Sequence, residues 1–392
     1  MCTSSLLFMD TMKFLFVIFI FLLILFAPDF YIYETVVKPM VFGGFQWLYW
    51  VPQIVVVLLM VAFAFEADQT AKFRHIGFAG FALLCLQLPK IAYTLVALVG
   101  RLAALVHIPT LPFTIIGVGL AGVILVTLLY GCFVELYKYD VRTVEIASPK
   151  LPPAFDGYKI VHISDIHSGS WNPNGRQMKR MVELVNSQNA DMVCFTGDLV
   201  TNNHSEIDPF FDILRTIQAN DGVFSVLGNH DYSFLMSTRD TLQRLIEKEQ
   251  NLGWRLLLNE NEKITRGNES IAIIGVENVG RPPFPHVGDL GKAQVGTDGL
   301  FSILLSHDPT HWREEVIPNT DIPLTLSGHT HAGQLDLPFL SLSRSMYPEY
   351  RGLYTEGEQS LYVNAGLGFT FFPIRIWARP EITVITLKNV KN

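Results

Sequence analysis

Residues 160–167, Ile-Val-His-Ile-Ser-Asp-Ile-His, decide the fold of the second half of this 392-residue chain. The first four are apolar and mostly β-branched apart from His162, which is typical of a short buried strand. Asp165 and His167 follow where the strand opens into a loop. Because His162 lies inside the strand, we expect it to be a core residue or to support a ligand rather than to bind one.

Four further stretches have the same layout, an apolar run followed at once by Asp, Asn or His. The runs are residues 192–195, 223–227, 301–305 and 322–326, and they are followed by Gly197-Asp198, Gly228-Asn229-His230-Asp231, Ser306-His307 and Gly328-His329-Thr330-His331. In α/β sheets, ligands bind beyond the carboxyl ends of the strands. We expect the glycines before Asp198, Asn229 and His329 to let the backbone turn sharply, so that the five motifs converge.

Together the motifs supply oxygen and nitrogen ligands of the kind that hold two adjacent divalent metal ions. They are Asp165, His167, Asp198, Asn229, His307, His329 and His331. His230 is left over for chemistry, and a metal pair is a known means of attacking a phosphate ester with water. We expect manganese, while iron, zinc or magnesium would also suit these ligands. A serine nucleophile is excluded because the chain has no Gly-x-Ser-x-Gly elbow.

This order of motifs resembles that of the calcineurin-like metallophosphoesterase superfamily over roughly residues 156–387. Residues 328–334, Leu337-Pro338 and residues 366–368 before Pro373 make the chain most similar to bacterial membrane-associated phosphoesterases. These include the membrane-anchored UDP-diacylglucosamine hydrolase-like phosphodiesterases. The resemblance implies an α/β domain of four layers, in which two mixed β-sheets are sandwiched by helices and the metals lie at one edge.

The resemblance also implies a role for each site residue. Asp165, His167 and His331 would hold the first metal, Asp198 would bridge both, and Asn229, His307 and His329 would hold the second. A metal-activated hydroxide would attack phosphorus, and His230 would steady the transition state or protonate the leaving oxygen. Asp231 would orient His230, since a carboxylate beside an imidazole fixes its tautomer. Residues 198–202 lack the further Asp and Arg that many relatives carry.

The first part of the chain is strongly apolar. Residues 14–27, 40–65, 76–100 and 111–134 are long apolar stretches, the third interrupted by Pro89-Lys90. Each is near or above the roughly 20 residues that cross a bilayer, so we predict an α-helical membrane bundle of about four helices within residues 1–137. A cleaved signal peptide is the alternative for the first stretch, but residues 26–29 form a poor cleavage site.

The prolines of residues 148–153 predict a linker, which we place at residues 138–155, ahead of a phosphoesterase domain at residues 156–392. Lys and Arg are more frequent in the loops on the N-terminal side of the predicted helices than in the opposite loops. This bias predicts a multi-pass protein of the inner, cytoplasmic membrane with its catalytic domain in the cytoplasm. The four cysteines form no extracellular disulfide pattern.

Residues 335–354 follow the last ligand motif, so we expect them to form a wall of the active site. With residues 369–377 they would provide an apolar rim for a lipid tail or for docking on the bilayer, and an ordinary core is the alternative. Arg344, Arg351 and Arg375 are candidates for gripping a second phosphate. His204, His286 and His311 are expected at the surface or in the substrate cleft.

The leading hypothesis is a membrane-anchored enzyme that hydrolyses a phosphodiester or pyrophosphate bond, on a lipid-linked substrate such as an acylated nucleotide sugar or a phospholipid. The alternative enzyme is a phosphodiesterase or phosphatase for soluble nucleotides. Residues 151–392 carry a net charge of −8, which disfavours a nucleic-acid polymer as a partner. A non-enzymatic scaffold is disfavoured because every expected metal ligand is retained. A transport role for the helices is disfavoured because the membrane stretches carry few charged residues, of which Lys90 is the main one.

Overall fold

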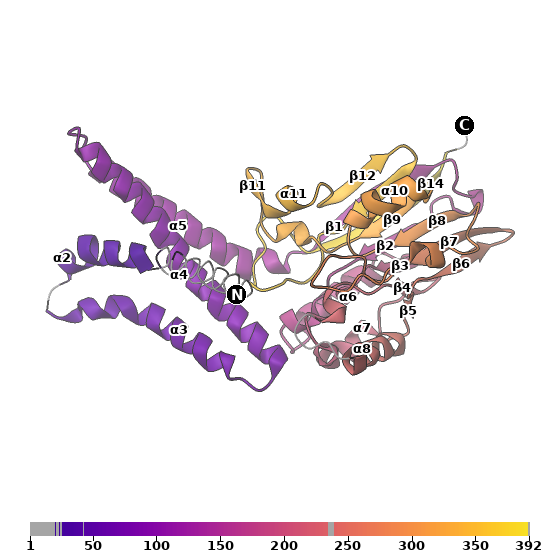
Figure 1. Cartoon of the computed structure of the whole chain (residues 1–392), viewed down its shortest axis with the longest axis horizontal. Coiled ribbons are helices and arrows are strands. Elements are labelled where there is room, and N and C mark those ends of the chain that lie inside the picture. Colours follow the sequence, from indigo (N-terminus) through magenta and orange to yellow (C-terminus); the bar gives the residue numbers. More distant parts are fainter. Residues whose placement is uncertain (1–19, 21–22, 24–25, 42, 234–238, 391–392) are drawn as a thin grey trace, which may run out of the picture. The chain divides into compact units, whose positions relative to one another are not determined.

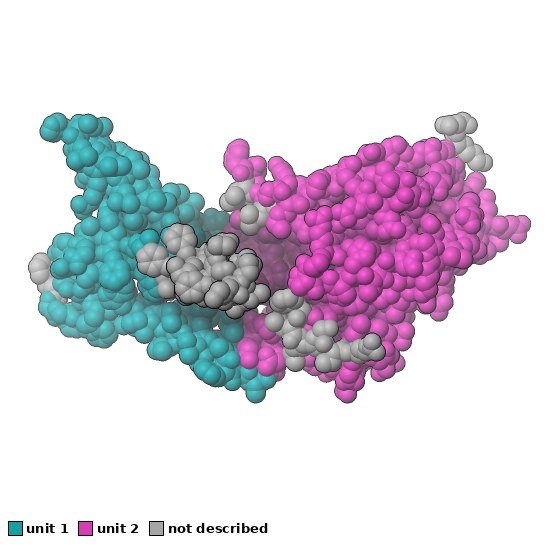
Figure 2. Space-filling model, viewed as in Figure 1, with its two compact units in different colours: residues 1–67, 75–130 teal, residues 68–74, 131–392 magenta. Residues whose placement is uncertain are grey.

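The computed structural model describes residues 20, 23, 26–41, 43–233 and 239–390. These form two compact units, coloured separately in Figure 2. The helical unit comprises residues 1–67 and 75–130, and the α/β unit comprises residues 68–74 and 131–392. The first residues of the helix Gln69–Ala104 and the last residues of the helix Leu111–Phe133 therefore belong to the α/β unit.

The helical unit contains three helices that are long and apolar enough to cross a membrane, spanning Phe45–Ala64, Gln69–Ala104 and Leu111–Tyr137. Its elements are η1 (Tyr33–Val37), α2 (Lys38–Met40), η2 (Phe45–Trp50), α3 (Val51–Ala64), α4 (Gln69–Ala104) and α5 (Leu111–Phe133). They correspond to three of the predicted membrane helices. Most of the first predicted stretch, residues 14–27, lies outside the described residues. Helix α4 continues through Pro89, so the proline that interrupts the apolar stretch does not end the helix.

A buried polar cluster lies inside the helical unit. The Asp29 carboxylate is fully buried and accepts hydrogen bonds from Lys90 Nζ at 2.5 Å and from Tyr49 Oη and Gln87 Nε2, both at 3.0 Å. A carboxylate in apolar surroundings is stable only when it is paired and hydrogen-bonded. This cluster therefore fastens the first helical segment to α4.

The α/β unit is built on two six-stranded mixed sheets (Figure 1). The first has the order β1-β14-β2-β3-β4-β5, and the second has the order β12-β13-β9-β8-β7-β6. The strands of the first sheet are β1 (Asp140–Ser148), β2 (Lys159–Ile163), β3 (Met192–Phe195), β4 (Val223–Ser225), β5 (Arg255–Leu256) and β14 (Glu381–Asn389). Those of the second are β6 (Glu260–Arg266), β7 (Glu269–Gly275), β8 (Phe301–Leu305), β9 (Leu324–Ser327), β12 (Gly352–Glu356) and β13 (Gln359–Val363).

Helices cover the outer face of each sheet. Side chains of β2, β3 and β4 meet those of β7, β8 and β9 in a core between the sheets. The opposite face of the first sheet packs on α6 (Arg176–Asn186), α7 (Phe211–Leu214) and α8 (Arg239–Asn251). The second packs on α9 (Leu290–Ala293) and on residues around α10 (Ile317–Asn319). The predicted fold of two mixed sheets sandwiched by helices is confirmed.

The segment predicted as a linker is largely a strand. Residues 140–148 form β1, which pairs in parallel with β14 along nine residues. Alternate side chains of this strand point inward, and Ile146 is buried in the core between the sheets. We missed the strand because we extended the proline-rich segment backward, although the prolines begin only after it ends. The α/β unit therefore begins almost directly after α5, with a 3₁₀ turn at Glu135–Tyr137.

Candidate metal centre

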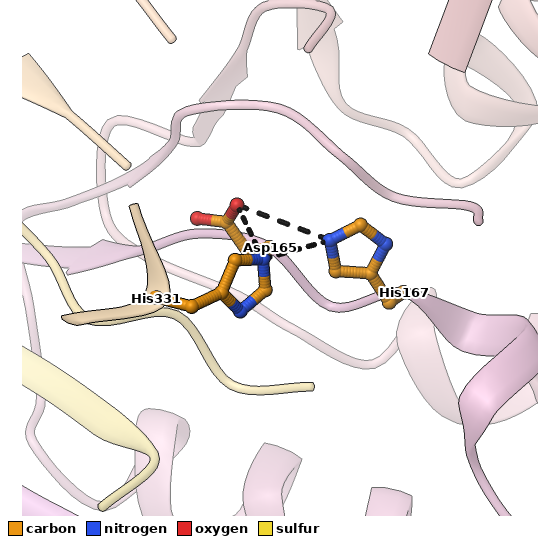
Figure 3. Close-up of side chains that lie close together, drawn as sticks. All are labelled: Asp165, His167 and His331. Atoms are coloured by element: carbon orange, nitrogen blue, oxygen red, sulfur yellow. Dashed lines mark hydrogen bonds and ion pairs between the residues drawn. The ribbon is translucent and has the colours of Figure 1, made fainter. Parts of the chain in front are cut away.

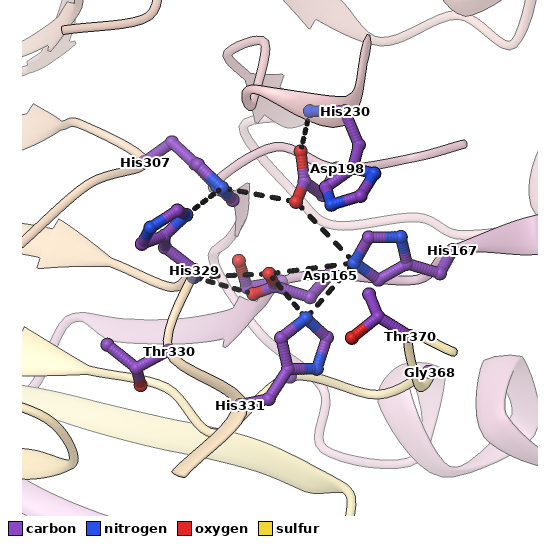
Figure 4. A network of polar contacts seen from close by, with 12 residues as sticks. Asp165, His167, Asp198, His230, His307, His329, Thr330, His331, Gly368 and Thr370 are labelled. Atoms are coloured by element: carbon purple, nitrogen blue, oxygen red, sulfur yellow. Dashed lines mark hydrogen bonds and ion pairs between the residues drawn. The ribbon is translucent and has the colours of Figure 1, made fainter. Parts of the chain in front are cut away.

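Strand ends from both sheets supply the predicted ligands. Asp165 and His167 follow β2, Asp198 follows β3, and Asn229 follows β4, all in the first sheet. In the second sheet, His307 follows β8 and two further histidines follow β9. The five strands that we predicted are all present, and Figure 4 shows that their side chains converge on one network.

The backbone at the centre is strained. Five of the predicted ligands have positive φ angles between 46° and 71°, namely Asp165, His167, Asp198, His329 and His331. Each left-handed residue costs about 1–2 kcal/mol, and such strain persists only where the surrounding structure over-determines it. The close packing of the neighbouring loops supplies that constraint.

The glycines in the motifs serve mainly to provide space. Only Gly197 has a positive φ, of 94°. A Cβ added to Gly228 would overlap Asp198, and one added to Gly328 would overlap Ser164 and Asp165. Our expectation of sharp turns is therefore wrong for these two glycines, because their role is to let one loop approach another closely.

Asp165, His167 and His331 form the first cluster, with ligand atoms that all lie within 4.8 Å of one another (Figure 3). The two Nε2 atoms of the histidines are 3.0 Å apart, and His331 Nε2 is 3.3 Å from Asp165 Oδ1. All three residues are buried. Atoms with lone pairs that face one another at this distance are arranged to share a cation.

Asn229, His307 and His329 form the second cluster. Asn229 Oδ1 is 3.0 Å from His307 Nε2 and 2.8 Å from His329 Nδ1. Asp198 lies between the clusters, since its Oδ2 atom is 3.2 Å from His307 Nε2 and 3.5 Å from His167 Nε2. One carboxylate thus faces a ligand nitrogen of each cluster (Figure 4).

The charges at the centre favour a cation. Burial raises the pKa of Asp198, but the neighbouring histidines outweigh burial and hold it well below its usual range. Burial lowers the pKa of His167 and of His329, so these rings are neutral and offer a lone pair. At His307, burial lowers the pKa, but Asp198 outweighs it and raises the pKa to about 10. The carboxylate thus attracts positive charge to this position, and divalent metals fit the donor set.

The outer nitrogens of the ligand rings are held by other groups. His307 Nδ1 donates to the Thr196 carbonyl at 2.7 Å, which leaves Nε2 free to bind a metal. His329 Nε2 lies 2.9 Å from the Tyr347 hydroxyl, which leaves Nδ1 facing the centre. Such partners fix the tautomer and orientation of a metal-binding histidine. Tyr347 lies in the predicted wall of the active site, but its contact with His329 was not predicted, because nothing in the sequence indicates that it folds back onto this ring.

His230 is held by a backbone carbonyl. Its Nδ1 atom donates to the Thr201 carbonyl at 2.9 Å, and its ring lies edge-on to His167. Its Nε2 atom is therefore left for a substrate. The loop that carries Thr201 is fastened by the buried Glu206, whose carboxylate accepts from the amides of Gly169, Thr201 and Asn202. Glu206 thus stabilises the loop after Asp198, and the sequence analysis did not predict this role.

The orienting role expected for Asp231 is wrong in this structure. Its Oδ2 atom accepts from the amides of Asp198 and Gly228, both at 2.8 Å, and its Oδ1 atom accepts from Val200 at 3.1 Å. The carboxylate thus ties the loop after β3 to the loop after β4. Burial and the nearby Asp198 raise the pKa of Asp231, and the hydrogen bonds from the backbone amides lower it. The net result is a raised pKa of about 7.

A cavity of about 470 Å³ adjoins the second cluster. Asn229 and His329 of that cluster are part of its lining. One wall is formed by residues 280–284 and another by residues 346–349, so part of the predicted wall is present. The polar groups of the lining are Arg281, Arg313, Asp308, Glu314 and Glu349, with Thr310 and Tyr347 beside them.

Two of the three arginines that we expected to grip a second phosphate are engaged with other groups, while the third, Arg344, is exposed and donates to the Tyr350 hydroxyl at 2.8 Å. Arg375 is fully buried and donates to the carbonyls of Ala365, Gly368 and Ala378. Arg351 pairs with Asp336 and donates to a backbone carbonyl. These hydrogen bonds hold loops in place and leave Arg375 unable to bind a substrate.

The remaining histidines differ from one another. His162 is fully buried, as we expected, and its Nε2 atom contacts Thr196 Oγ1 at 2.9 Å. His204 is half-buried and His286 is exposed, as we expected for the surface. His311 was expected at the surface or in the cleft, but it is buried between Ser306 Oγ and Glu315.

Comparisons with known proteins agree with this geometry. Residues 158–333 match the family described as calcineurin-like phosphoesterase, and residues 12–135 match one described as probable calcineurin-like phosphoesterase, transmembrane domain. The chain is 34% identical to the uncharacterized metallophosphoesterase YkuE of Bacillus subtilis, over 66% of this chain and 89% of that protein.

Relatives also occur in eukaryotes. The chain is 34% identical to a transmembrane protein with metallophosphoesterase domain of Danio rerio, over 66% of this chain and 60% of that protein. It is 32% identical to an uncharacterized metallophosphoesterase of Campylobacter jejuni, over 64% of each. The chain belongs to the calcineurin-like metallophosphoesterases and is a metal-dependent phosphoric ester hydrolase with a transmembrane region.

Proposed function

We propose that this protein hydrolyses a phosphodiester at a centre of two divalent metal ions, held by the two clusters and bridged by Asp198. The observation that carries the proposal is the position of Asp198 Oδ2, within 3.5 Å of a ligand nitrogen from each cluster. Manganese is the metal we expect. When bound, the metals would polarise the phosphate and lower the pKa of water.

The residues of the chain would position and protonate the substrate. His230 Nε2 is free while its Nδ1 atom is held by Thr201, so it would hydrogen-bond the phosphate or protonate the leaving oxygen. Asp231 keeps the loops of Asp198 and His230 together through three backbone amides. In this arrangement His230 acts on the substrate directly, and Asp231 acts only through the backbone.

The cavity favours a phosphodiester over a pyrophosphate. Arg281 pairs with Glu314 at 2.7 Å, and Arg313 pairs with Glu349 and Glu356, so each guanidinium already has a carboxylate beside it that a second phosphate would have to displace. The apolar lining of Pro282, Phe284 and Met346 suits a leaving group with an apolar part. These features support a lipid-linked substrate, and a soluble nucleotide is the second candidate.

We also propose that the transmembrane region spans residues 1–137 with four helices and that the catalytic domain faces the cytoplasm at the inner membrane. The end of α5 and the start of α4 both belong to the α/β unit, so both lie on the same side of a bilayer. The loops on that side of the bilayer are also the ones that are richer in Lys and Arg, which indicates the cytoplasmic side.

The test is hydrolysis by the purified full-length chain of a chromogenic phosphodiester, the matching monoester and a fluorescent phospholipid in vesicles, with Mn, Zn and Mg in turn. We expect metal-dependent cleavage of diesters that is lost in Asp198→Ala and falls about 100-fold or more in His230→Ala. His204→Ala, a half-buried histidine outside the centre, is the matched control. Cleavage that survives Asp198→Ala would refute the proposal, and a preference for the soluble diester would favour the second candidate.

A further inference from the structure

The α/β unit exposes large aromatic side chains on two segments that pair with each other. Within its described residues, the exposed Phe and Trp side chains are Phe133, at the end of α5, together with Phe339, Phe371 and Trp377. Phe339 is 100% exposed, Phe371 is 83% exposed and Trp377 is 56% exposed. We name these last three residues the aromatic face. Large apolar side chains gathered in this way mark an interaction surface.

The aromatic face is held together by backbone pairing. Phe339 lies in the turn between β10 (Asp336–Leu337) and β11 (Leu340–Ser341). The amide of Asp336 donates to the Ile376 carbonyl at 3.0 Å, and the amide of Ile376 donates to the Gln334 carbonyl at 2.8 Å. The hairpin and the segment that carries Phe371 and Trp377 therefore form one surface.

This surface is fixed to the end of the last transmembrane helix. A Cβ at Gly131 would overlap Ile374 and Ile376, so the helix packs directly on that segment. The buried carboxylate of Glu135 accepts from the Trp377 amide at 3.1 Å and pairs with Arg379 at 3.3 Å. All of these contacts lie within the α/β unit.

The helix sets the depth of the aromatic face. Helix α5 has 23 residues and is thus roughly 35 Å long, close to the roughly 30 Å of a bilayer core. Its last turn lies at the membrane boundary, where Trp and other aromatic side chains are enriched. Phe371 and Trp377 also have positive φ angles, of 63° and 60°, an uncommon backbone for aromatic residues that is typical of functional segments.

We propose that Phe339, Phe371 and Trp377 dock the α/β unit on the lipid bilayer, with their side chains inserted into the interfacial layer around the end of α5. The same segment reaches the metal centre, where Figure 4 shows Gly368 and Thr370 beside the candidate ligands. The Gly368 amide donates to the Asp165 carbonyl at 2.7 Å, and Arg375 Nη2 lies 3.2 Å from His331 Nδ1. Docking thereby holds the centre close to lipid headgroups. The net charge of −8 on residues 151–392 makes apolar insertion, rather than charge attraction, the means of contact.

The test uses the full-length chain in nanodiscs that contain a lipid with a nitroxide near its headgroup. A bimane fluorophore is attached to Phe371→Cys or Phe339→Cys, in a background in which Cys2 and Cys85 are replaced by serine. Val295→Cys is the matched control, because Val295 is apolar and 71% exposed beside β6. Metal content and soluble diester hydrolysis show that each labelled variant is folded.

We expect the nitroxide lipid to quench both aromatic-face labels at least threefold more than the Val295→Cys label. If Phe371→Cys fails to fold, Phe339→Cys decides the test, since its side chain has no protein surface over it. Quenching of both labels at the level of the control would overturn the proposal. That result would leave the phosphodiesterase proposal intact, because the soluble diester is measured separately.

Discussion

Replacing Asp231 by alanine separates two accounts of this residue. In the structure its carboxylate accepts from three buried backbone amides, those of Asp198, Val200 and Gly228. Each amide that is left without a partner costs about 1–3 kcal/mol. Asp231→Ala should therefore lower the free energy of unfolding by about 5 kcal/mol, partly offset by relief of repulsion with Asp198.

Thermal unfolding of the purified chain measures this effect. In a domain of this size each kcal/mol corresponds to roughly 2–4 °C, so the Tm should fall by about 10–20 °C. Retention of metal should also weaken by about tenfold or more, since Asp198 loses its support. Asp191→Ala is the control, because that carboxylate accepts from the Lys159 amide at the opposite end of β3. It should lower the Tm without loss of metal.

The alternative account, in which Asp231 orients His230, predicts a different pattern. The Tm and the metal content of Asp231→Ala would stay within error of the wild type. Only the pH profile of hydrolysis would shift, as it would when His230 itself is replaced. That combination would refute the reasoning from the backbone amides.

Three further predictions concern other parts of the molecule. Burial raises the pKa of the Glu249 carboxyl from 4.5 to about 8. Between these pH values the folded chain keeps the carboxyl proton and the unfolded chain loses it. The free energy of unfolding should therefore fall by on the order of 5 kcal/mol as pH rises from about 4.5 to 8. Glu249→Gln should remove that slope, measured as the Tm at pH 5 and pH 8.5, and an unchanged slope would contradict this. Lys90→Met leaves Asp29 buried without its cation and should lower the free energy of unfolding in detergent by about 3–5 kcal/mol. Replacing both residues by leucine should recover most of that free energy, and an equal loss in the single and double variants would contradict a stabilising role of the ion pair. Tyr347→Phe removes the hydroxyl that contacts His329, a proposed ligand of the second metal, and should weaken retention of that metal about tenfold or more against a chelator, while Tyr350→Phe should not; similar behaviour of both variants would contradict the proposed role of His329.

The sequence predicts where the candidate ligands lie in the fold, because they follow strands that can be recognised locally. The apolar run of β2 and the Asp165 motif after it are local features, and a short buried strand must deliver its next residues to the edge of the sheet. The strands that end in ligands are also recognisable from composition alone. The layout of the centre could therefore be predicted before any tertiary contact was known.

The supporting contacts could not be predicted in the same way. Asp231, Tyr347 and Arg375 act through partners between 3 and 44 residues away, and only the fold decides which of those partners each side chain meets. The pairing of β1 could not be predicted either, because its partner β14 lies at the other end of the chain. Long-range pairing leaves little trace in local sequence.

The central claim is that Asp198 bridges two metals, and the most direct test is metal content by mass spectrometry after the full-length chain is loaded with manganese and dialysed. We expect about two ions per chain in the wild type, about one in Asn229→Ala and almost none in Asp198→Ala, with folding verified by Tm. Loss of only one ion in Asp198→Ala, or fewer than about one ion per chain in the folded wild type, would contradict the bridged metal pair.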